Sequence, residues 1–352
     1  MAQAGSANAR TTLSAVRDFA SKQAIVLVLL GLILVTTIFQ PKFFSVGNFT
    51  NVLMIASVYV IISLGETPIL LTKGVDLSAG RMVGLTACIA ASMLQRPDYA
   101  SKIFDGIPFM PVLIPIILAV LVGLTVGMVN GIIVAFLKVP PFITTLGTMV
   151  IVYGITSLYV DRPPHGASPI GGLREDFTGI SQGAIPISGD LRIPFILIIA
   201  AIVVFIMWVV LNKSRFGKNI YAIGANPDAA TVSGVNVSRT LIGVYILAGA
   251  LYGLAGALQA ARQGSATNNL GFTWELDAIA ACVIGGVSTS GGIGTVKGVV
   301  IGVLIMQVLA NALLFVKLPD WMGSPIYWQQ IIKGLIIIIA VGLDIRKYLK
   351  KR

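Results

Sequence analysis

The chain alternates long apolar runs with shorter polar connections. A transmembrane helix needs about 20 predominantly apolar residues, and slightly shorter ones also occur. Ten runs approach or exceed this length: residues 24–40, 49–72, 78–95, 111–137, 142–160, 193–212, 241–261, 274–289, 294–316 and 327–345. The pattern predicts an all-α polytopic membrane protein with about ten helices in a domain of residues 24–345. The first run lacks a small-residue cleavage site after it, so we interpret it as an uncleaved span.

One polar interruption, residues 213–240, carries a clear positive excess. Within it, Asn226 is a typical N-cap, Pro227 suits the first helical position, and Gly234 suits a helix stop. Asp228 between them is favourable to the helix dipole. The pattern predicts a helix of one to two turns, which is too short to be stable alone. We therefore expect this helix to dock on a partner.

Composition and charge agree with a membrane location. The 352 residues are 56% hydrophobic and 11% charged, and the mean hydropathy of +0.91 is far above that of soluble domains. The net charge of +11 would suggest nucleic acid in a soluble protein. In a membrane protein, however, Lys and Arg collect in cytoplasmic segments, so we expect no nucleic-acid partner.

The polar connections fall into two classes by charge. The net charge is +2 in residues 1–23, +3 in 213–239 and +4 in 344–352, but zero in 96–110 and −1 in 161–192. The positive-inside rule therefore places the N-terminal segment 1–23, the loop 213–240 and the basic tail 346–352 in the cytoplasm. The loop 161–192 is expected on the opposite side, and both chain ends are expected inside.

One pattern of residues occurs twice in the sequence. Gly123-x-x-x-Gly127-x-x-x-Gly131 precedes Phe136-Leu-Lys138-Val-Pro140, and Gly294-x-x-x-Gly298-x-x-x-Gly302 precedes Phe315-Val-Lys317-Leu-Pro319. The two ladders lie five spans apart, so they predict two five-helix halves related by inverted topology. Close helix packing explains each glycine ladder without a repeat.

Missing residue patterns argue against several kinds of chemistry. Cys88 and Cys282 lie in apolar runs, where a thiol behaves as a small hydrophobe, so we expect neither a disulfide nor a metal site. The single histidine, His165, excludes His dyads and His-rich metal clusters. No Gly-x-x-x-x-Gly-Lys-Ser/Thr phosphate loop occurs. The chain is therefore expected to bind no metal or cofactor itself and not to be an enzyme.

Charges inside apolar runs are the default functional signal in a membrane protein, because inserting each costs at least about 2.5 to 3.5 kcal/mol. Glu66 precedes Pro68, where a broken helix would free backbone groups. Helix capping accounts equally well for Asp76, and helix N-terminal charge does so for Glu275 and Asp277.

Other polar residues extend this set. Snorkelling of long side chains explains Lys297 and Lys333. Neutral polar residues that would line a wet path include Asn130, Thr148, Gln259, Gln307 and Asn311. The residues predicted to line a polar path through the membrane are Glu66, Asp76, Thr144, Thr145, Asn268, Asn269, Trp274, Glu275 and Asp277.

Several segments resemble one known family. Arg215-Phe-Gly-Lys-Asn, Ala222-Ile-Gly-Ala-Asn-Pro-Asp-Ala-Ala230 and Ser233-Gly-Val resemble the ATPase-coupling loop in permease subunits of bacterial monosaccharide importers of the ATP-binding-cassette class, ribose and galactose type. Gly74-Val-Asp-Leu-Ser-Ala-Gly80, Pro141-Phe-Ile-Thr-Thr-Leu-Gly-Thr148 and Glu275-Leu-Asp-Ala-Ile-Ala-Ala-Cys282 are similar to the same family. The likeness covers nearly the whole chain from about residue 24, and residues 265–282 are most similar to the galactose type.

The resemblance implies a homodimeric permease in the bacterial inner membrane that imports a neutral monosaccharide. A tandem-domain ATPase, which binds ATP and Mg, would dock on the cytoplasmic loop, and a periplasmic sugar-binding protein would deliver the substrate. Trp274, Phe272 and Tyr245 would stack on the sugar ring. Asp228 departs from the glutamate of other importers. The residues matched to ATPase coupling are Arg215, Gly217, Asn226, Pro227, Asp228, Ala229, Ala230, Ser233 and Gly234.

Two other function classes remain open on the residues alone. A stand-alone, ion-coupled secondary sugar carrier would use Glu66 and the inverted repeat, although no second carboxylate or His lies at matching depth. A membrane-embedded enzyme has little support, because no acid/base pair or nucleophile constellation occurs.

Overall fold

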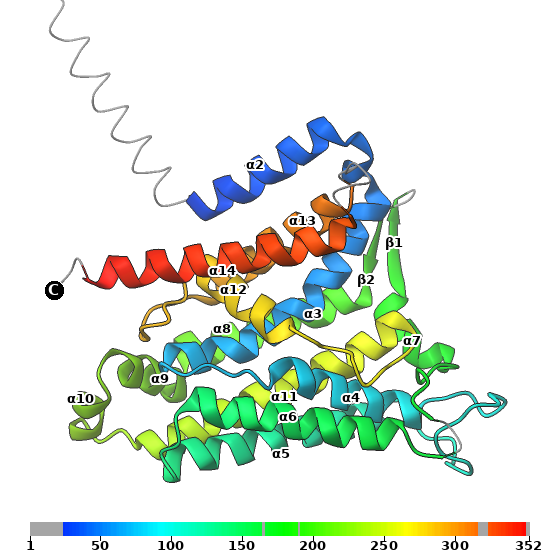
Figure 1. Cartoon of the computed structure of the whole chain (residues 1–352), viewed down its shortest axis with the longest axis horizontal. Helices are drawn as coiled ribbons and strands as arrows, with labels where there is room; N and C mark the ends of the chain where they lie inside the picture. The colour runs from blue at the N-terminus through cyan, green and yellow to red at the C-terminus, as the bar shows by residue number, and fades with distance from the viewer. Residues whose placement is uncertain (1–23, 164–165, 189–190, 316–322, 350–352) are drawn as a thin grey trace, which may run out of the picture.

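A computed structural model describes residues 24–163, 166–188, 191–315 and 323–349 (Figure 1). The N-terminal segment 1–23, His165, Lys317, Pro319 and residues 350–352 of the basic tail lie outside these ranges.

Each predicted apolar run contains a helix. Six of these helices are long and apolar enough to cross a membrane, which confirms an all-α polytopic fold. The helices are α2 (Ala24–Phe39), α3 (Val46–Leu71), α4 (Ala79–Met93), α5 (Leu113–Phe136), α6 (Pro141–Val160), α8 (Phe195–Lys213), α11 (Val237–Gln263), α12 (Trp274–Ile284), α13 (Val296–Leu314) and α14 (Pro325–Leu349).

Short elements occupy the two ends of the bundle (Figure 1). At one end, called here the α10 end, lie α9 (Arg215–Ala225) and α10 (Pro227–Val232). At the other, the hairpin end, lie α7 (Glu175–Gln182) and the antiparallel strands β1 (Ala184–Ser188) and β2 (Leu191–Pro194). A 3-10 turn, η1 (Pro41–Phe44), joins α2 to α3.

α4 and α12 are the two shortest of the ten helices in the described part of the chain. α4 has 15 residues and α12 has 11, which correspond to about 22 and 17 Å at 1.5 Å per residue. Each follows a stretch without long helix, 72–78 or 264–273, and each begins well inside the bundle (Figure 1). By this measure the predictions of full spans over 78–95 and 274–289 are both wrong: α4 ends at Met93, and α12 ends at Ile284, before Gly285 and Gly286.

α4 and α12, each with the non-helical stretch before it, are called the half-crossings here. The two half-crossings meet at a pair of glycines. A Cβ atom on Gly80 would collide with the carbonyl of Gly271, and one on Gly271 would collide with the carbonyl of Gly80. Gly271 also has a φ of +80°, which side chains rarely adopt. Only glycine at both positions lets these segments touch.

The helix pairings support the predicted inverted repeat. α5 packs on α11 as α13 packs on α3, and α4 packs on α5 and α6 as α12 packs on α13 and α14. The similar segments Asp76-Leu-Ser-Ala79 and Glu275-Leu-Asp-Ala278 lie near the starts of α4 and α12, although the first reaches α4 only at Ala79 and the second lies within α12. The outer helices depart from this symmetry, because α2 packs on α13 whereas α8 packs on α3.

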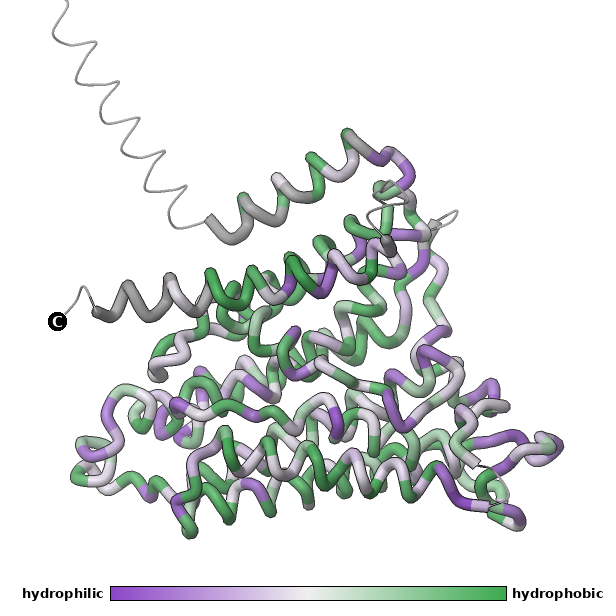
Figure 2. The backbone as a smooth tube through the Cα atoms, in the orientation of Figure 1, coloured by the Kyte–Doolittle hydropathy of each residue, from purple (hydrophilic) through white to green (hydrophobic). Residues whose placement is uncertain are grey.

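Burial separates inner helices from outer ones. The membrane-spanning window of α3 is 83% buried, whereas α5 and α8 are each 28% buried. Their exposed side chains are mostly apolar, and Figure 2 shows polar residues concentrated toward the ends of the bundle. The outer helices therefore face lipid or another subunit, while α3 lies at the centre.

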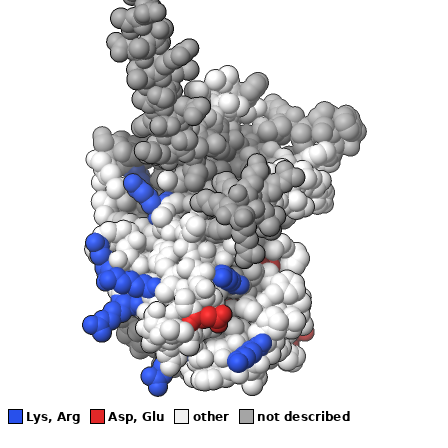
Figure 3. Space-filling model, turned by 90° about the vertical axis from the view of Figure 1, so that its left-hand side faces the viewer, with Lys and Arg blue, Asp and Glu red and all other residues white. Residues whose placement is uncertain are grey.

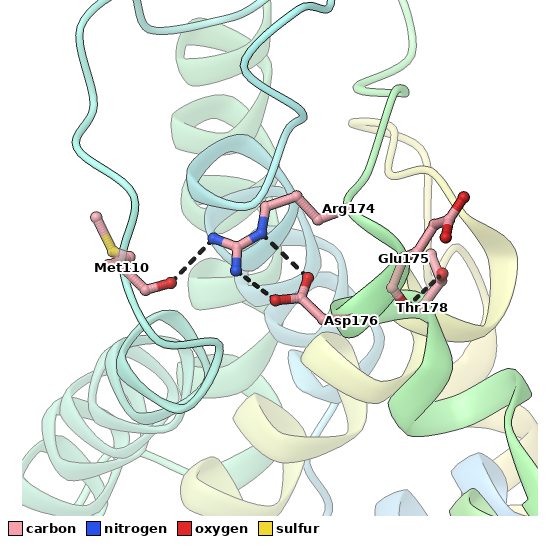
Figure 4. Close-up of polar contacts among 5 residues, drawn as sticks. All are labelled: Met110, Arg174, Glu175, Asp176 and Thr178. Atoms are coloured by element: carbon pink, nitrogen blue, oxygen red, sulfur yellow. Dashed lines mark hydrogen bonds and ion pairs between the residues drawn. The ribbon is translucent and has the colours of Figure 1, made fainter.

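The hairpin end is tied together by Arg174, which is 7% exposed (Figure 4). Its Nε donates to Asp176 Oδ1 at 3.0 Å, and its Nη1 donates to the Met110 carbonyl at 2.9 Å. The guanidinium also stacks on the Phe109 ring at 3.7 Å. These contacts fix the loop before α5 to the start of α7.

The glycine ladder of α5 permits close contact with α11, as its spacing predicts. A Cβ atom on Gly127 would collide with the Tyr245 carbonyl, whereas Gly147 of α6 has no atom within 4 Å of that position. We expect Gly127→Ala to destabilise the chain by about 1–3 kcal/mol, because the helices must move apart. Gly147→Ala is the matched control, and it should be neutral or stabilising by up to about 1 kcal/mol. Unfolding of the purified chain in detergent measures both, and equal stabilities would contradict the packing described.

Candidate functional site

The short helix α10 forms where the capping pattern predicts it. Asn226 Oδ1 accepts from the backbone N–H groups of Asp228 at 3.0 Å and Ala229 at 3.1 Å. Pro227 is the first helical residue, and Gly234 follows the helix with a φ of +83°. The predicted N-cap, first-turn proline and glycine stop are therefore confirmed.

The faces of α10 differ in exposure. Asp228 and Ala229 are exposed, as are Ser233 and Gly234, whereas Ala230 is 4% exposed. Val232 is 90% exposed, which is unusual for an aliphatic side chain. An apolar side chain held out in this way offers a partner surface to cover.

A second helix, α9, was missed by the sequence analysis, which treated these residues as loop. Ser214 caps it by accepting from the Gly217 N–H at 2.9 Å. Gly217 makes the turn from α8 possible, because a Cβ there would collide with the carbonyls of Val210 and Leu211. Arg215 at its start is exposed. The Ser-x-x-Gly cap after a hydrophobic run was the sequence signal for this helix.

α9 is wedged against the ends of the inner helices. A Cβ on Gly224 would collide with the carbonyl of Leu71, the last residue of α3. Tyr221 donates its hydroxyl to the Gly294 carbonyl at 2.9 Å. Burial raises the pKa of Tyr221, so the hydroxyl stays protonated and remains a donor. The Gly292 N–H in turn donates to Leu71 O at 2.9 Å.

The α10 end is strongly basic (Figure 3). Its exposed charged residues in the described part of the chain are one carboxylate, Asp228, and the bases Lys73, Lys138, Lys213, Arg215, Lys218, Arg239 and Lys297. The hairpin end mixes acids and bases evenly. The prediction of the membrane orientation from the sequence rests on this difference in charge between the two ends.

Inside the bundle, the carboxylate of Glu66 accepts two hydrogen bonds. Its Oε1 accepts from the Asp76 N–H and its Oε2 from the Tyr252 hydroxyl, both at 2.9 Å. Glu66 is completely buried. α3 continues past Pro68 to Leu71, so the expectation of a helix broken at this proline is wrong. Glu66 instead holds the backbone of the returning segment 72–78.

Other predicted path residues bind the same segment. Asp76 Oδ1 accepts from the Ser78 N–H at 2.8 Å, and Thr145 Oγ1 accepts from the Leu77 N–H at 3.0 Å. Asn130 donates to Ser78 Oγ at 3.1 Å and accepts from Thr148 at 2.6 Å. The side chains of Asp76, Ser78, Asn130, Thr145 and Thr148 are all buried. Asp76 therefore stabilises the turn just before α4, but the N-cap of α4 is Ser78, so the interpretation of Asp76 as the helix cap is not confirmed.

The start of α12 forms a second polar cluster. Asp277 Oδ2 and Lys333 Nζ are 2.8 Å apart, with both side chains largely buried. Trp274 stacks obliquely on Tyr59, with ring centroids 4.9 Å apart. The prediction that Lys333 snorkels is wrong, because its side chain reaches inward to the carboxylate of Asp277. The sequence analysis did not identify these two residues as partners.

The remaining predicted residues lie around these clusters without joining them. Asn268 donates to Ser157 Oγ at 3.4 Å, and Asn269 accepts from Arg81 at 3.4 Å. Thr144 Oγ1 and Glu275 Oε2 are buried without a hydrogen-bond partner in the described part of the chain. The nine predicted path residues therefore lie in two polar clusters and beside them, and their lining of a path stays a prediction.

Comparison with known proteins gives one family and a consistent set of relatives. Residues 48–341 match the family described as branched-chain amino acid transport system / permease component. The chain is 51% identical to the galactose/methyl galactoside import permease protein MglC of Escherichia coli, over 94% of this chain and 96% of the relative. The protein of the same name from Haemophilus influenzae is 48% identical over 93% and 94%.

A second kind of sugar permease is more distant. The ribose import permease protein RbsC of Bacillus subtilis is 38% identical over 90% of both chains. No solved structure matches the chain significantly.

The Glu66–Tyr252 contact yields a stability prediction. Tyr252→Phe leaves Glu66 Oε2 buried without its donor, so we expect a loss of about 1–3 kcal/mol of unfolding free energy. Tyr153→Phe is the control, because Tyr153 is 41% exposed and its hydroxyl makes no hydrogen bond within the described residues. Unfolding titrations in micelles compare the two, and a Tyr252→Phe chain as stable as the control would show that this hydrogen bond is not structural.

Proposed function

Because the chain belongs to the family of transport-system permease components, we propose that it is the membrane-spanning subunit of an ATP-binding-cassette importer for a neutral monosaccharide of the galactose type. High identity to galactose/methyl galactoside permeases along almost the whole chain supports this substrate class. The lower identity to ribose permeases favours a hexose over a pentose.

Energy enters this importer through a separate ATPase that binds ATP and Mg. The observation that carries this proposal is α10, a capped helix at the basic end whose apolar Val232 is 90% exposed. Such a short helix gains stability and a function when a groove on the ATPase covers it. A periplasmic sugar-binding protein and a second copy of this chain complete the assembly.

The orientation follows from charge. The α10 end carries the basic excess, so it faces the cytoplasm of a bacterial inner membrane, and the hairpin end faces the periplasm. In the described residues, α2 begins and α14 ends toward the α10 end (Figure 1), which supports the proposal that both chain ends are cytoplasmic.

Movement of α10 has a direct route to the membrane interior. α10 packs on α9, and α9 contacts the last residue of α3 and the loop before α13. The end of α3 leads into residues 72–78, which Glu66 and Thr145 hold. A displacement of the ATPase therefore shifts both half-crossings through rigid contacts.

The hydrogen bonds that Glu66 accepts disfavour an ion-coupled carrier. Both of its carboxylate oxygens accept hydrogen bonds from groups that hold the fold, so it is not a free proton carrier. Uptake in reconstituted vesicles decides the matter. Galactose accumulation is expected only when the partner ATPase, ATP and binding protein are present. Accumulation driven by an ion gradient alone would refute the proposal.

The α10 surface gives a matched pair of variants. Val232→Asp should weaken association with the ATPase about tenfold, because an exposed apolar contact is lost. Ile187→Asp makes the same change in β1, where Ile187 is 54% exposed, and should leave association unchanged. Co-purification of the ATPase with each membrane-inserted variant measures the effect, and equal recovery would remove Val232 from the contact.

Charge reversal tests the same helix in transport. Asp228→Lys or Ala229→Trp is expected to reduce ATP-driven uptake at least about tenfold while the chain still inserts, because both residues are exposed on α10. Ala230 is buried, so a bulky residue there tests loop folding instead. Uptake at the unmodified rate in both exposed variants would exclude α10 from coupling.

A further inference from the structure

A cavity of about 180 Å³ opens between α3, α13 and α14. Its polar walls are Tyr59 of α3, Gln307 and Asn311 of α13, and Gln329 and Lys333 of α14. The lining residues come from the first half of α3, the first half of α14 and the second half of α13. The cavity therefore lies in the half of the bundle nearer the hairpin end.

Buried amides with unused hydrogen-bonding groups line this cavity. Gln307 is 8% exposed, and its side chain makes no hydrogen bond within the residues that the structure describes. Asn311 accepts from Asn48 Nδ2 at 2.9 Å through its oxygen, which leaves its own amide N–H groups available. These amide groups face the cavity and are not among the fully buried atoms that lack a partner, so they are accessible to a bound molecule. A ligand with hydroxyl groups matches them, because hydroxyls both donate and accept hydrogen bonds.

An aromatic surface and a neutralised charge pair complete the walls. The Tyr59 ring lines the cavity and is backed by Trp274 at a centroid distance of 4.9 Å. Lys333 Nζ lies 2.8 Å from Asp277 Oδ2, so the ammonium is already paired. Aromatic faces suit the C–H face of a sugar ring. A paired lysine offers no free charge to the carboxylate of an amino acid.

We propose that this cavity is a sugar-binding subsite on the translocation path, in which Gln307 and Asn311 bind hydroxyl groups and Tyr59 contacts the ring. The inference rests on the proposed function and specifies where the substrate is held. It assigns a role to Gln307, Gln329 and Tyr59.

Thiol labelling tests occupancy of the cavity directly. Cys88 and Cys282 are both buried, so a single cysteine introduced by Gln329→Cys is the accessible thiol of the described chain. The full chain, assembled with its ATPase in membranes, is treated with a small methanethiosulfonate. At about ten times its Kd, D-galactose should slow labelling about tenfold, since only the free fraction reacts. Gln263→Cys, exposed at the end of α11, is the control, and galactose should not protect it.

Uptake kinetics test the amide. Gln307→Leu keeps the side-chain volume and removes the hydrogen-bonding groups, so kcat/KM for galactose uptake should fall about tenfold. Gln263→Leu should leave uptake unchanged. Recovery of the ATPase with the Gln307→Leu chain checks that the variant is folded.

The outcomes separate the two proposals. If the unmodified chain imports galactose but Gln307→Leu imports it equally well and galactose does not protect Gln329→Cys, the subsite is overturned and the permease function stands. If the assembled complex imports no monosaccharide, the proposed function fails. Protection by leucine and not by galactose overturns the sugar subsite in either case.

Discussion

The structure depends on satisfying backbone polar groups where the bilayer supplies no hydrogen bonds. Residues 72–78 run back into the bundle outside a regular helix, and their N–H groups need partners from side chains. Glu66 accepts from Asp76, Thr145 from Leu77, and the Asp76 carboxylate from Ser78. The buried charges of this region therefore have a structural use. The half-crossings α4 and α12 can then meet through bare backbone at Gly80 and Gly271.

This constraint explains which features the sequence reveals and which it hides. Apolar runs and the Asn226-Pro227 cap depend on local sequence, so a helix in each apolar run and α10 were predicted correctly, whereas α9 was missed. The end of α12 at Ile284 depends on how Gly285 packs against Gly298 of α13, which hydropathy does not detect. Partners such as Tyr252 for Glu66 and Lys333 for Asp277 are 186 and 56 residues away. Their identity required the fold.

The inverted arrangement gives the two half-crossings different environments. The segment before α4 is hydrogen-bonded by residues of α3, α5 and α6, whereas the start of α12 contacts two residues that line the cavity, through the Trp274–Tyr59 ring contact and the Asp277–Lys333 ion pair. Asp76-Leu-Ser is therefore a structural anchor in the first half, whereas in the second half Asp277 and Trp274 lie behind the cavity wall, in contact with Lys333 and Tyr59. The α9 wedge at Leu71 and Gly294 connects both to the basic end.

The unequal burial of the spans bears on how the protein is made. α8, with a mean hydropathy of 3.0 and a mostly exposed surface, is apolar enough to reside in lipid by itself. α3, at 1.8 and 83% buried, carries Glu66 and several hydroxyl groups, so lipid alone is a poor environment for it. Its partner α11 is synthesised more than 160 residues later. During biosynthesis the polar side chains of α3 therefore have to be kept away from lipid, by the insertion machinery or by neighbouring helices, until α11 is synthesised and packs on α3.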